Sequence, residues 1–528
     1  MTAAGDTDVA IVGAGHNGLV AAVMLARAGL SVRVLEAADV VGGACRTERP
    51  FPRAPGMRQS TGAYLLGLMP PELLARLDLE LPTVRRDPHY FLPTTGSRYL
   101  LLGSDRAEAR RQFLEFFSER DFEANQALDA ELDALREDVG PTWLEEPRPI
   151  EETAERYVRP ALRRAFVDLC RGSVGAYLDR FGFRSELVAA MYAVTDGFTG
   201  LYGGWDTPGS GMNFLIHNMC RLRDSDGTWM IVEGGMGTVT SRLAEAARRA
   251  GARIDTNAEV ARIELEGGVA RGVALRRGEM VRARAVVVGA DPFRLLDLVG
   301  RDACPAELRA RIDGYRRDGS TLKVNLCLDD LPRFRCLPER RGQHHGTIHL
   351  LPEDGEVLST LRRSFEDVQS GRLPEQPCIE WYIHTPLDPS LSDEAGRHSS
   401  ALFVQWVPYE PAGSTWDAEE SRYVEHLLSI CDRFAPDTSS LVHDVFTLTP
   451  PKIERHFGMS RGHIHHVDNS FGFADRMPYR TPIEGLYACG AGCHPGGSVI
   501  GAAGHNAAVR LMKDLGVLDG DAGDQRAR

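Results

Sequence analysis

Three glycines near the N-terminus have the spacing that holds a phosphate group. Gly13, Gly15 and Gly18 follow residues 9–12, an apolar run with the β-branched character of a buried parallel strand. In such a motif the first glycine permits a tight turn, the second lets the backbone approach a pyrophosphate, and the third lets the next helix pack close to the strand. The N-terminus of that helix attracts the anion. The spacing therefore predicts a dinucleotide-binding turn.

An acidic residue completes this motif. Glu36 follows a second predicted strand, residues 31–35, and lies about twenty residues beyond the glycines, where a carboxylate binds ribose hydroxyls. A carboxylate here favours an adenosine without a 2′-phosphate. The motif alone leaves open whether the dinucleotide is NAD or FAD.

A second glycine-rich segment lies close to the other end of the sequence, at residues 485–501. Gly496 and Gly497 would let the backbone approach a flat ring closely. A helix predicted to begin near Val499 would direct its positive end at that ring and stabilise negative charge on a reduced flavin. Two such segments, one near each end of the sequence, indicate a single FAD held by both.

The segment Val-Val-Gly-Gly-Ala-Cys-Arg-Thr at residues 40–47 adds a family resemblance. It resembles the double-glycine segment of the FAD-dependent amine oxidase and phytoene desaturase superfamily. With the two glycine segments, the chain is similar to the phytoene-dehydrogenase-like family of FAD oxidoreductases, most strongly at residues 8–64, 230–291 and 479–510.

The resemblance implies a set of FAD-binding residues. They are Gly13, Gly15, Gly18, Glu36, Gly42, Gly43, Arg46, Gly62, Ala63, Val260, Gly490, Ala491, Gly497, Ser498, Val499 and Ile500. Ala491 replaces the aspartate of the broader FAD fold but agrees with the desaturase branch, whereas Cys493 stands where that branch more often has threonine.

The resemblance also implies an α/β fold of glutathione-reductase-like topology. It comprises an FAD-binding Rossmann domain and a second, substrate domain with a mixed or antiparallel sheet and a helical insertion. We expect FAD-binding parts at 1–80, 225–300 and 470–515, a helical insertion or substrate region at 81–224, a substrate domain at 301–469, and a disordered tail at 516–528.

Two residues are candidates for catalysis. Lys323 lies in a segment, residues 320–328, that resembles the strand of flavin amine oxidases that places a lysine beside flavin N5 through a water. His494, in the C-terminal glycine segment, is expected to contact the ring or the substrate, or to be satisfied by backbone partners. Other candidates for the substrate pocket are Tyr202, Trp205 and His217, for which simple packing is the alternative.

No metal site is expected. Alternation places His463 and His465 on one face of a predicted strand, but the sequence shows no third ligand nearby. The ten cysteines contain no CxxC pair, which favours reduced thiols in a cytoplasmic protein.

Composition excludes other classes of function. With a net charge of −13, the 528-residue chain lacks the cationic balance that nucleic acid attracts. No apolar run reaches the roughly 18 residues that a spanning helix needs, so we expect a cytoplasmic protein, with peripheral membrane contact left open. Hydrolase, kinase and zinc-peptidase motifs are missing from the sequence.

The predicted function is therefore an FAD-dependent dehydrogenase. It would take hydride from a largely apolar substrate, such as an isoprenoid, a polyene or a specialised metabolite, form a C=C bond, and pass electrons to oxygen or a quinone. Three alternatives stay open: a flavin amine oxidase that forms C=N, a redox-neutral polyene isomerase, and a non-catalytic FAD-fold binding protein. The sequence leaves the substrate, the electron acceptor and the oligomeric state undetermined.

Overall fold

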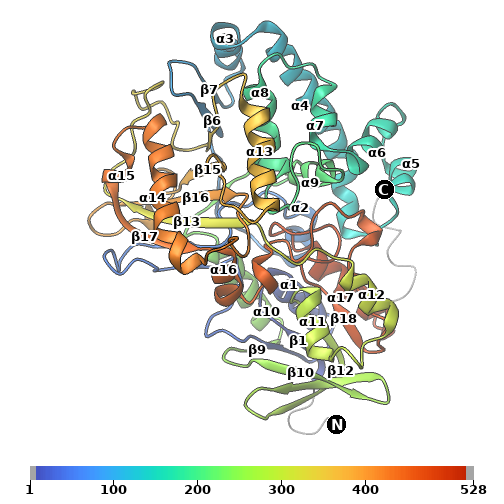
Figure 1. Ribbon diagram of the computed structural model, residues 1–528. Helices are drawn as coiled ribbons and strands as arrows, with labels where there is room; N and C mark the ends of the chain where they lie inside the picture. Colours follow the sequence, from blue (N-terminus) through green and yellow to red (C-terminus); the bar gives the residue numbers. More distant parts are fainter. Residues whose placement is uncertain (1–6, 519–528) are drawn as a thin grey trace.

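The computed structural model describes residues 7–518 and arranges them in two large sheets with helices around them (Figure 1). The first sheet contains β1 (Thr7–Val12), β2 (Val32–Leu35), β9 (Arg253–Asp255), β10 (Val260–Glu266), β11 (Val269–Leu275), β12 (Met280–Val288) and β18 (Leu486–Ala488). Its core is parallel, in the order β9-β2-β1-β12-β18, and β10 and β11 extend it from β12 as an antiparallel meander.

The apolar run of β1 is explained by its central position. Val9, Ala10 and Ile11 are fully buried, because β1 lies between β2 and β12 and belongs to one core with the helices of this domain. These helices are α1 (His16–Arg27), α10 (Gly237–Arg249) and α17 (Ala502–Asp514), and α1 contacts both of the others. Strand β18 and helix α17 come from the C-terminal segment, so the two ends of the described chain meet in one domain.

The second sheet stands beside the first and is built almost wholly from the middle of the chain. Its strands are β6 (Tyr90–Pro93), β7 (Tyr99–Leu102), β13 (Thr321–Leu328), β14 (Thr347–Leu350), β15 (Cys378–Ile383), β16 (His398–Gln405) and β17 (Val442–Leu448). They lie in the order β17-β13-β16-β15-β14-β6-β7, with every pair antiparallel except β14 and β6. Helix α14 (Trp416–Phe434) covers one face, and the other face looks toward the first sheet and the helical layer.

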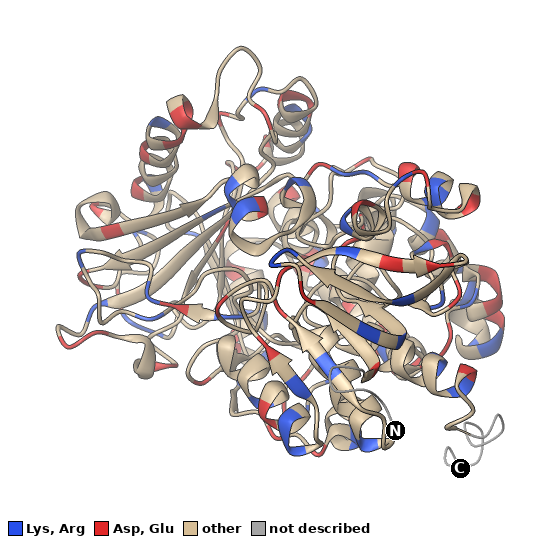
Figure 2. Cartoon of the chain, turned by 90° about the horizontal axis from the view of Figure 1, so that it is seen from below, with Lys and Arg blue, Asp and Glu red and all other residues tan. Residues whose placement is uncertain are grey.

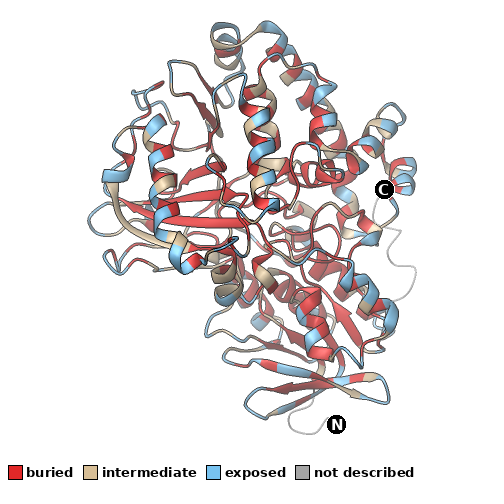
Figure 3. Ribbon diagram, in the orientation of Figure 1, coloured by how far each residue is buried: buried red, intermediate tan, exposed pale blue. Residues whose placement is uncertain are grey.

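A layer of helices fills the top and right of Figure 1. Its members are α3 (Arg106–Phe116), α4 (Glu119–Val139), α5 (Ile150–Tyr157), α6 (Arg163–Arg171), α7 (Val174–Asp179), α8 (Glu186–Tyr192), the π-helical turn η3 (Ala193–Gly197) and α9 (Ser210–His217). Their apolar sides form one core with α13 (Val357–Gln369), and Figure 3 shows the buried stripes turned inward. Helices α3 to α9 lie within residues 81–224, the range predicted as a helical insertion or substrate region, whereas β6 and β7 of that range belong to the second sheet.

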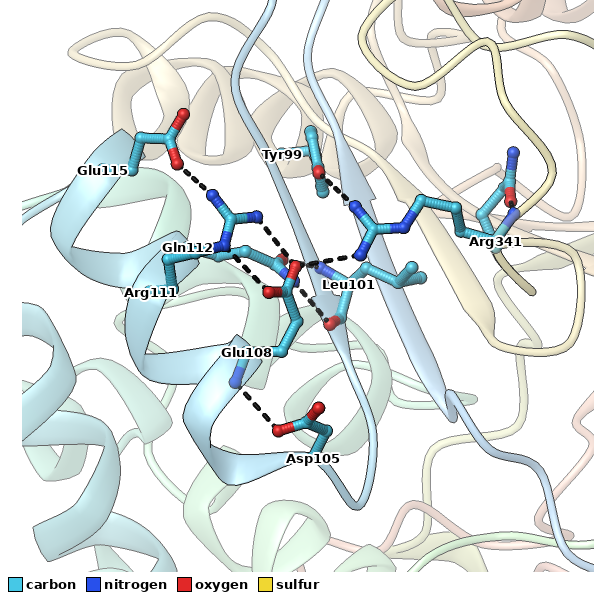
Figure 4. A network of polar contacts seen from close by, with 9 residues as sticks. Tyr99, Leu101, Asp105, Glu108, Arg111, Gln112, Glu115 and Arg341 are labelled. Carbon is cyan, nitrogen blue, oxygen red and sulfur yellow. Dashed lines mark hydrogen bonds and ion pairs between the residues drawn. The ribbon is translucent and has the colours of Figure 1, made fainter.

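Polar contacts join this layer to the second sheet (Figure 4). The side chain of Gln112 on α3 accepts a hydrogen bond from the backbone N–H of Leu101 on β7 and donates one to the carbonyl of the same residue. Glu108 accepts hydrogen bonds from Arg111 and Arg341, and these lower the pKa of its carboxyl to about 2. The guanidinium of Arg341 therefore connects α3 to the loop before β14.

The remaining elements are short connections and surface helices. They are β3 (Thr47–Glu48), β4 (Gln59–Ser60), β5 (Thr83–Val84), β8 (Ile231–Val232), α2 (Pro71–Leu77), α11 (Pro292–Val299), α12 (Ala306–Asp313), α15 (Thr438–Leu441) and α16 (Pro450–Phe457), with short 3₁₀ turns at Gly140–Leu144, Pro160–Leu162, Pro389–Leu391, Ser460–Gly462 and Phe473–Asp475. Basic and acidic side chains alternate over the outer elements (Figure 2). In the described part, no helix is long and apolar enough to cross a membrane.

Two sequence-based expectations of local structure are wrong. Residues 463–466 form turns and not a strand, because the preceding Ser460–Gly462 segment and His466 adopt positive φ angles at Arg461, Gly462 and His466. Helix α17 begins at Ala502 and not near Val499, since Ser498 (φ 95°) and Val499 (φ 58°) are left-handed. The predicted tail lies mostly outside the described residues.

The crossing of β1 and α1 depends on Gly18. A Cβ atom at this position would lie 2.2 Å from the carbonyl oxygen of Gly13 and 3.5 Å from Cγ2 of Ile11. We expect Gly18→Ala to lower the free energy of unfolding by about 3 kcal/mol, because the helix must move away from the strand. Denaturant titration measures this loss. Gly96→Ala, whose Cβ would have no neighbour closer than 3.9 Å, is the control and should unfold like the unaltered chain.

Candidate active site

One cavity of about 630 Å³ runs from the first turn of α1 to the second sheet. At its first end it is lined by the glycine turn, by Glu36 and by Val260. At its far end it is lined by side chains of the second sheet, Lys323 and Glu380 among them. The cavity therefore joins the predicted dinucleotide turn to the predicted substrate domain.

The first end suits a phosphate. Gly15 is the N-cap of α1 and no side chain caps this helix, so the N–H groups of the first turn are available to an anion. A Cβ atom at Gly15 would meet no protein atom within 4 Å, which leaves room for a ligand against the backbone. Glu36 accepts hydrogen bonds from the N–H groups of Ala14 (2.7 Å) and Ala38 (2.9 Å), and these fix its carboxylate beside the turn.

The C-terminal segment closes the middle of the cavity. The hydroxyl of Ser498 lies 2.9 Å from Nε2 of His217 on α9 and 3.2 Å from Nε2 of His465. Nδ1 of His217 is 3.0 Å from the carbonyl of Asp196 and must donate to it, so Nε2 accepts from Ser498, and His465 then donates to the same hydroxyl. Burial lowers the pKa of His217 to about 4, which keeps this ring neutral. These bonds connect α9 of the helical layer to the C-terminal glycine segment.

The far end is organised by the register of the second sheet. Lys323 on β13 pairs with Phe403 on β16, Phe403 pairs with Glu380 on β15, and Glu380 pairs with His349 on β14. Directly paired residues of antiparallel strands point to the same face, so these four side chains form one row on the face that looks into the cavity. Lys323, Phe403 and Glu380 line the cavity itself.

The amino group of Lys323 is held by aromatic rings. Its side chain is 4% exposed, and Nζ lies 4.2 Å from the ring centres of both Tyr64 and Phe403. Burial lowers the pKa of Lys323 to about 7, and the nearby carboxyl of Glu380 limits the fall. The lysine is therefore close to the balance between its charged and neutral forms at neutral pH.

Glu380 has the opposite shift for the same reason. Burial raises the pKa of its carboxyl to about 7, against the hydrogen bonds it accepts and the attraction of Lys323. Tyr382 and Thr195 donate to Oε2, and Thr199 donates to Oε1 at 3.1 Å. The guanidinium of Arg86, bound to the carbonyl of Trp229 and to Thr347, adds a buried positive charge nearby.

Most of the predicted site residues lie together. The residues that line the cavity are Gly13, Gly15, Gly18, Glu36, Gly42, Gly43, Gly62, Ala63, Val260, Lys323, Ala491, Ser498 and Val499, together with His217. Arg46, Gly490, Gly497 and Ile500 do not line it. Arg46 instead donates to the carbonyl of His456 and pairs with Glu48, while a Cβ at Gly490 or Gly497 would collide with Ala290 or His465. The contacts of all these residues with FAD stay predictions.

His494 lies away from the cavity. Its ring packs edge-on against Phe473 at 5.0 Å, and burial lowers its pKa to about 3. Trp205 and Tyr202 also pack elsewhere, in the helical core and against Arg316. His463 pairs with Asp468, and residues 7–518 contain no cluster of three metal-type ligands. His494, Tyr202, Trp205 and His463 therefore contact other protein side chains and do not line the cavity.

Sequence reasoning missed the carboxyl side of the site. Glu380, Tyr382, Thr195, Thr199 and His349 come from segments without a motif. The signal that was present is a charged residue inside an apolar strand pattern: Glu380 interrupts the run Cys-Ile-Glu-Trp-Tyr-Ile of β15. An acid in such a strand is buried and costly unless it is paired or functional.

Comparisons with known proteins show what this sequence is similar to. The sequence profile of flavin-containing amine oxidoreductases matches residues 18–365. The chain is 34% identical to the mouse protein named pyridine nucleotide-disulfide oxidoreductase domain-containing protein 2, over 96% of this chain and 94% of that one. It is 25% identical to a limonene dehydrogenase subunit of Castellaniella defragrans (97% and 95% covered) and 28% identical to hydroxyneurosporene desaturase of Cereibacter sphaeroides (96% and 98% covered).

Solved structures share the fold. An oxidoreductase from Methanosarcina mazei superposes with a TM-score of 0.62 at 18% identity, covering 96% of this chain and all of that one. Putrescine oxidase bound to putrescine gives 0.62 at 19% identity, with 97% and 99% covered. The predicted fold class, a Rossmann-like parallel sheet with a second mixed sheet, is confirmed. So is FAD as the cofactor of this kind of protein, and the open glycine turn at α1 fits its pyrophosphate.

Gly15→Ala should weaken FAD binding without disturbing the fold. Gly15 has φ −69°, which alanine adopts freely, and the new methyl group would enter only the cavity. We expect a lower ratio of flavin to protein after purification and at least a tenfold higher dissociation constant for FAD. The melting temperature of the protein without FAD should not change. An FAD affinity equal to that of the unaltered chain would contradict this assignment of the turn.

Lys323→Met should raise the free energy of unfolding, and by more at pH 7 than at pH 9, because it removes a buried amine. The folded chain binds this proton with a pKa of about 7 and the unfolded chain with an ordinary value near 10.5, so the unfolded state holds more protons between these values. The stability of the unaltered protein therefore rises with pH in that window. From pH 7 to 9 we expect the advantage of the variant to shrink by about 2 kcal/mol. Thermal and denaturant unfolding at both pH values measure it, and Lys513→Met, at an exposed lysine, should show no such trend.

Proposed function

Since the chain belongs to the family of flavin-containing amine oxidoreductases and is an FAD-dependent oxidoreductase, we propose that it is a dehydrogenase of the phytoene-dehydrogenase-like branch. It removes hydride from a small, largely apolar substrate and leaves a C=C bond. Two relatives over nearly the whole chain bear the names of a limonene dehydrogenase subunit and a hydroxyneurosporene desaturase, which supports this branch.

The observation that carries the proposal is the position of the Lys323 amino group. It occupies the space between the rings of Tyr64 and Phe403, where a cationic substrate would otherwise be attracted. An amine of the protein thus already occupies this space, so an uncharged substrate can bind beside it without bringing a further charge into a buried site. A substrate ammonium would have to displace Lys323 from between the rings.

The size of the cavity bears on the substrate. Sites for drug-sized ligands occupy about 300–1,000 Å³. The cavity of about 630 Å³ lies within this range. FAD would take the part at the glycine turn, which leaves the far end, beside Lys323 and Glu380, for the substrate.

The residues of the chain have clear tasks in this reaction. FAD, when bound, accepts the hydride. The glycine turn and Glu36 bind one end of the cofactor. The hydrogen bond between Ser498 and His217 holds the C-terminal glycine segment beside the cofactor. Tyr64 and Phe403 exclude water and orient an apolar substrate, while Lys323 and Glu380 supply the proton-transfer groups. Electrons leave to oxygen or a quinone.

A second candidate is amine oxidation to C=N. It is favoured by the buried carboxyl of Glu380, which would pair with a substrate ammonium, and by the aromatic rings around it. The two candidates differ in the class of compound that reduces the bound FAD.

Anaerobic visible spectra of the purified holoprotein test the proposal. We expect the oxidised flavin band to bleach on addition of a short cyclic or linear terpene, and the product to be lighter than the substrate by two hydrogen atoms. Bleaching by primary, secondary or tertiary amines alone would establish the second candidate instead. An unchanged band with an isomerised product would indicate a redox-neutral isomerase, and no response to any compound would favour an FAD-binding protein without turnover.

A further inference from the structure

Lysine is nearly absent from this chain. Of its 61 basic residues only three are lysines, Lys323, Lys452 and Lys513, and the rest are arginines. Lys513 is exposed, and Lys452 forms an ion pair with Glu420 near the surface. Lys323 alone of the three is buried, and it lies at the cavity.

An arginine would serve better if the site required only a cation. Its planar guanidinium stacks on aromatic rings and stays charged at any pH that a protein tolerates. The chain uses arginine over rings at several other places, for example Arg316 over Tyr202 and Arg461 over Tyr409. What lysine offers and arginine does not is an amine that can lose its proton.

Glu380 is the group that balances this amine. It lies in the same row of the sheet, two strands away across Phe403, and faces the same cavity. The two groups do not form a direct ion pair within 4 Å, so their charges interact through a poorly solvated space. In such surroundings a neutral amine beside a neutral carboxyl avoids the cost of burying two charges.

We propose that Lys323 and Glu380 hold one proton between them and that the neutral amine of Lys323 is the base of the reaction. The inference rests on the proposed dehydrogenation. As the C=C bond forms, two C–H bonds on adjacent carbons break: the hydride passes with its electron pair to FAD, which is reduced, and the other hydrogen passes as a proton to Nζ of Lys323. The resulting ammonium lies between Tyr64 and Phe403, whose rings stabilise it.

The surroundings of Glu380 allow its proton to leave. Oε2 contacts the hydroxyl of Thr195, which lies 2.5 Å from Nε2 of His349, and Nδ1 of His349 lies 2.8 Å from the hydroxyl of Tyr90. Each of these groups can both donate and accept a proton. The chain can therefore be hydrogen-bonded in either direction, one direction suited to the carboxyl and the other to the carboxylate.

Tyr90, a half-buried residue of β6, is the last member of this chain of contacts. When Lys323 becomes charged, Glu380 can lose its proton along Thr195 and His349, which keeps the net charge of the pair unchanged. Four other titratable groups face the pair. They are Tyr64 in the segment after β4, Tyr382 on β15, Arg86 in the loop before β6 and Asp196 in η3.

The scarcity of lysine makes a direct measurement possible. Holoprotein grown with lysine labelled with ¹³C at Cε should give three NMR signals, and Lys323→Met identifies the one from Lys323. We expect this signal to titrate near pH 7. In Glu380→Gln the titration should move to lower pH, because the carboxylate that favours the charged amine is gone. The Lys513 signal should be the same in both proteins.

Two results would overturn the proposal. One is a Lys323 signal that titrates near the usual lysine value of about 10.4. The other is a titration that Glu380→Gln leaves in place. Because neither measurement needs a substrate, both stand whether or not the proposed dehydrogenation is correct.

Rates of anaerobic flavin reduction by a bleaching compound give the functional test. In the unaltered protein the rate should rise with pH through about 7, since the neutral amine is the base. Lys323→Arg keeps a cation in place but supplies no base, so we expect the rate to fall by about 10² to 10⁴-fold and to lose this rise. Retained flavin absorbance and melting temperature serve as controls for folding. Reduction of Lys323→Arg at the unaltered rate would exclude the lysine as the base.

Discussion

The contact between α17 and the first turn of α1 is the constraint on which the rest of the molecule depends. A Cβ atom at Gly504 would lie 2.1 Å from the carbonyl oxygen of Asn17, so the two helices touch backbone to backbone. This contact sets β18 beside β12 and brings Ser498 within reach of His217. The cavity exists because segments from the two ends of the chain are held at this distance, and any side chain at residue 504 would separate them.

The second sheet contributes rigidity of another kind. Residues in one register row stand at fixed spacings, so the backbone hydrogen bonds of the sheet set where the side chains of Lys323, Phe403 and Glu380 leave the strands. One face of this sheet is anchored on α14 and the other carries the polar row. A carboxyl and an amine that would each be costly to bury alone are thereby kept near one another.

The sequence predicted the elements whose signals are local. The strand, turn, helix and acid from residue 9 to Glu36 follow from periodicity and turn residues. The family resemblance connected the two glycine segments. It also supplied Lys323, whose strand by itself reads as ordinary sheet.

The rest could not be read from the sequence because it is set by pairing at a distance. Glu380 meets the cavity only through the register of β15 against β16, and Thr195 reaches it only because a π-helical turn follows α8. Helix α17 begins late because Ser498 and Val499 adopt left-handed φ angles. Neither residue is a glycine, so the sequence did not indicate this conformation. His494 looked functional from its neighbours, but its ring turns toward Phe473.

The arrangement also fixes an order of events during synthesis. The ribosome makes the phosphate-binding turn at Gly13 early and the Ser498 segment late, and at about 5–20 residues per second roughly 25–100 seconds separate them. Throughout that interval the first sheet lacks β18, and α1 lacks its partner α17. The cavity then lacks the part of its wall that Ala491, Ser498 and Val499 form. We therefore expect FAD to be captured firmly only once the C-terminal segment has left the ribosome, so that loading of the cofactor is a late step of maturation.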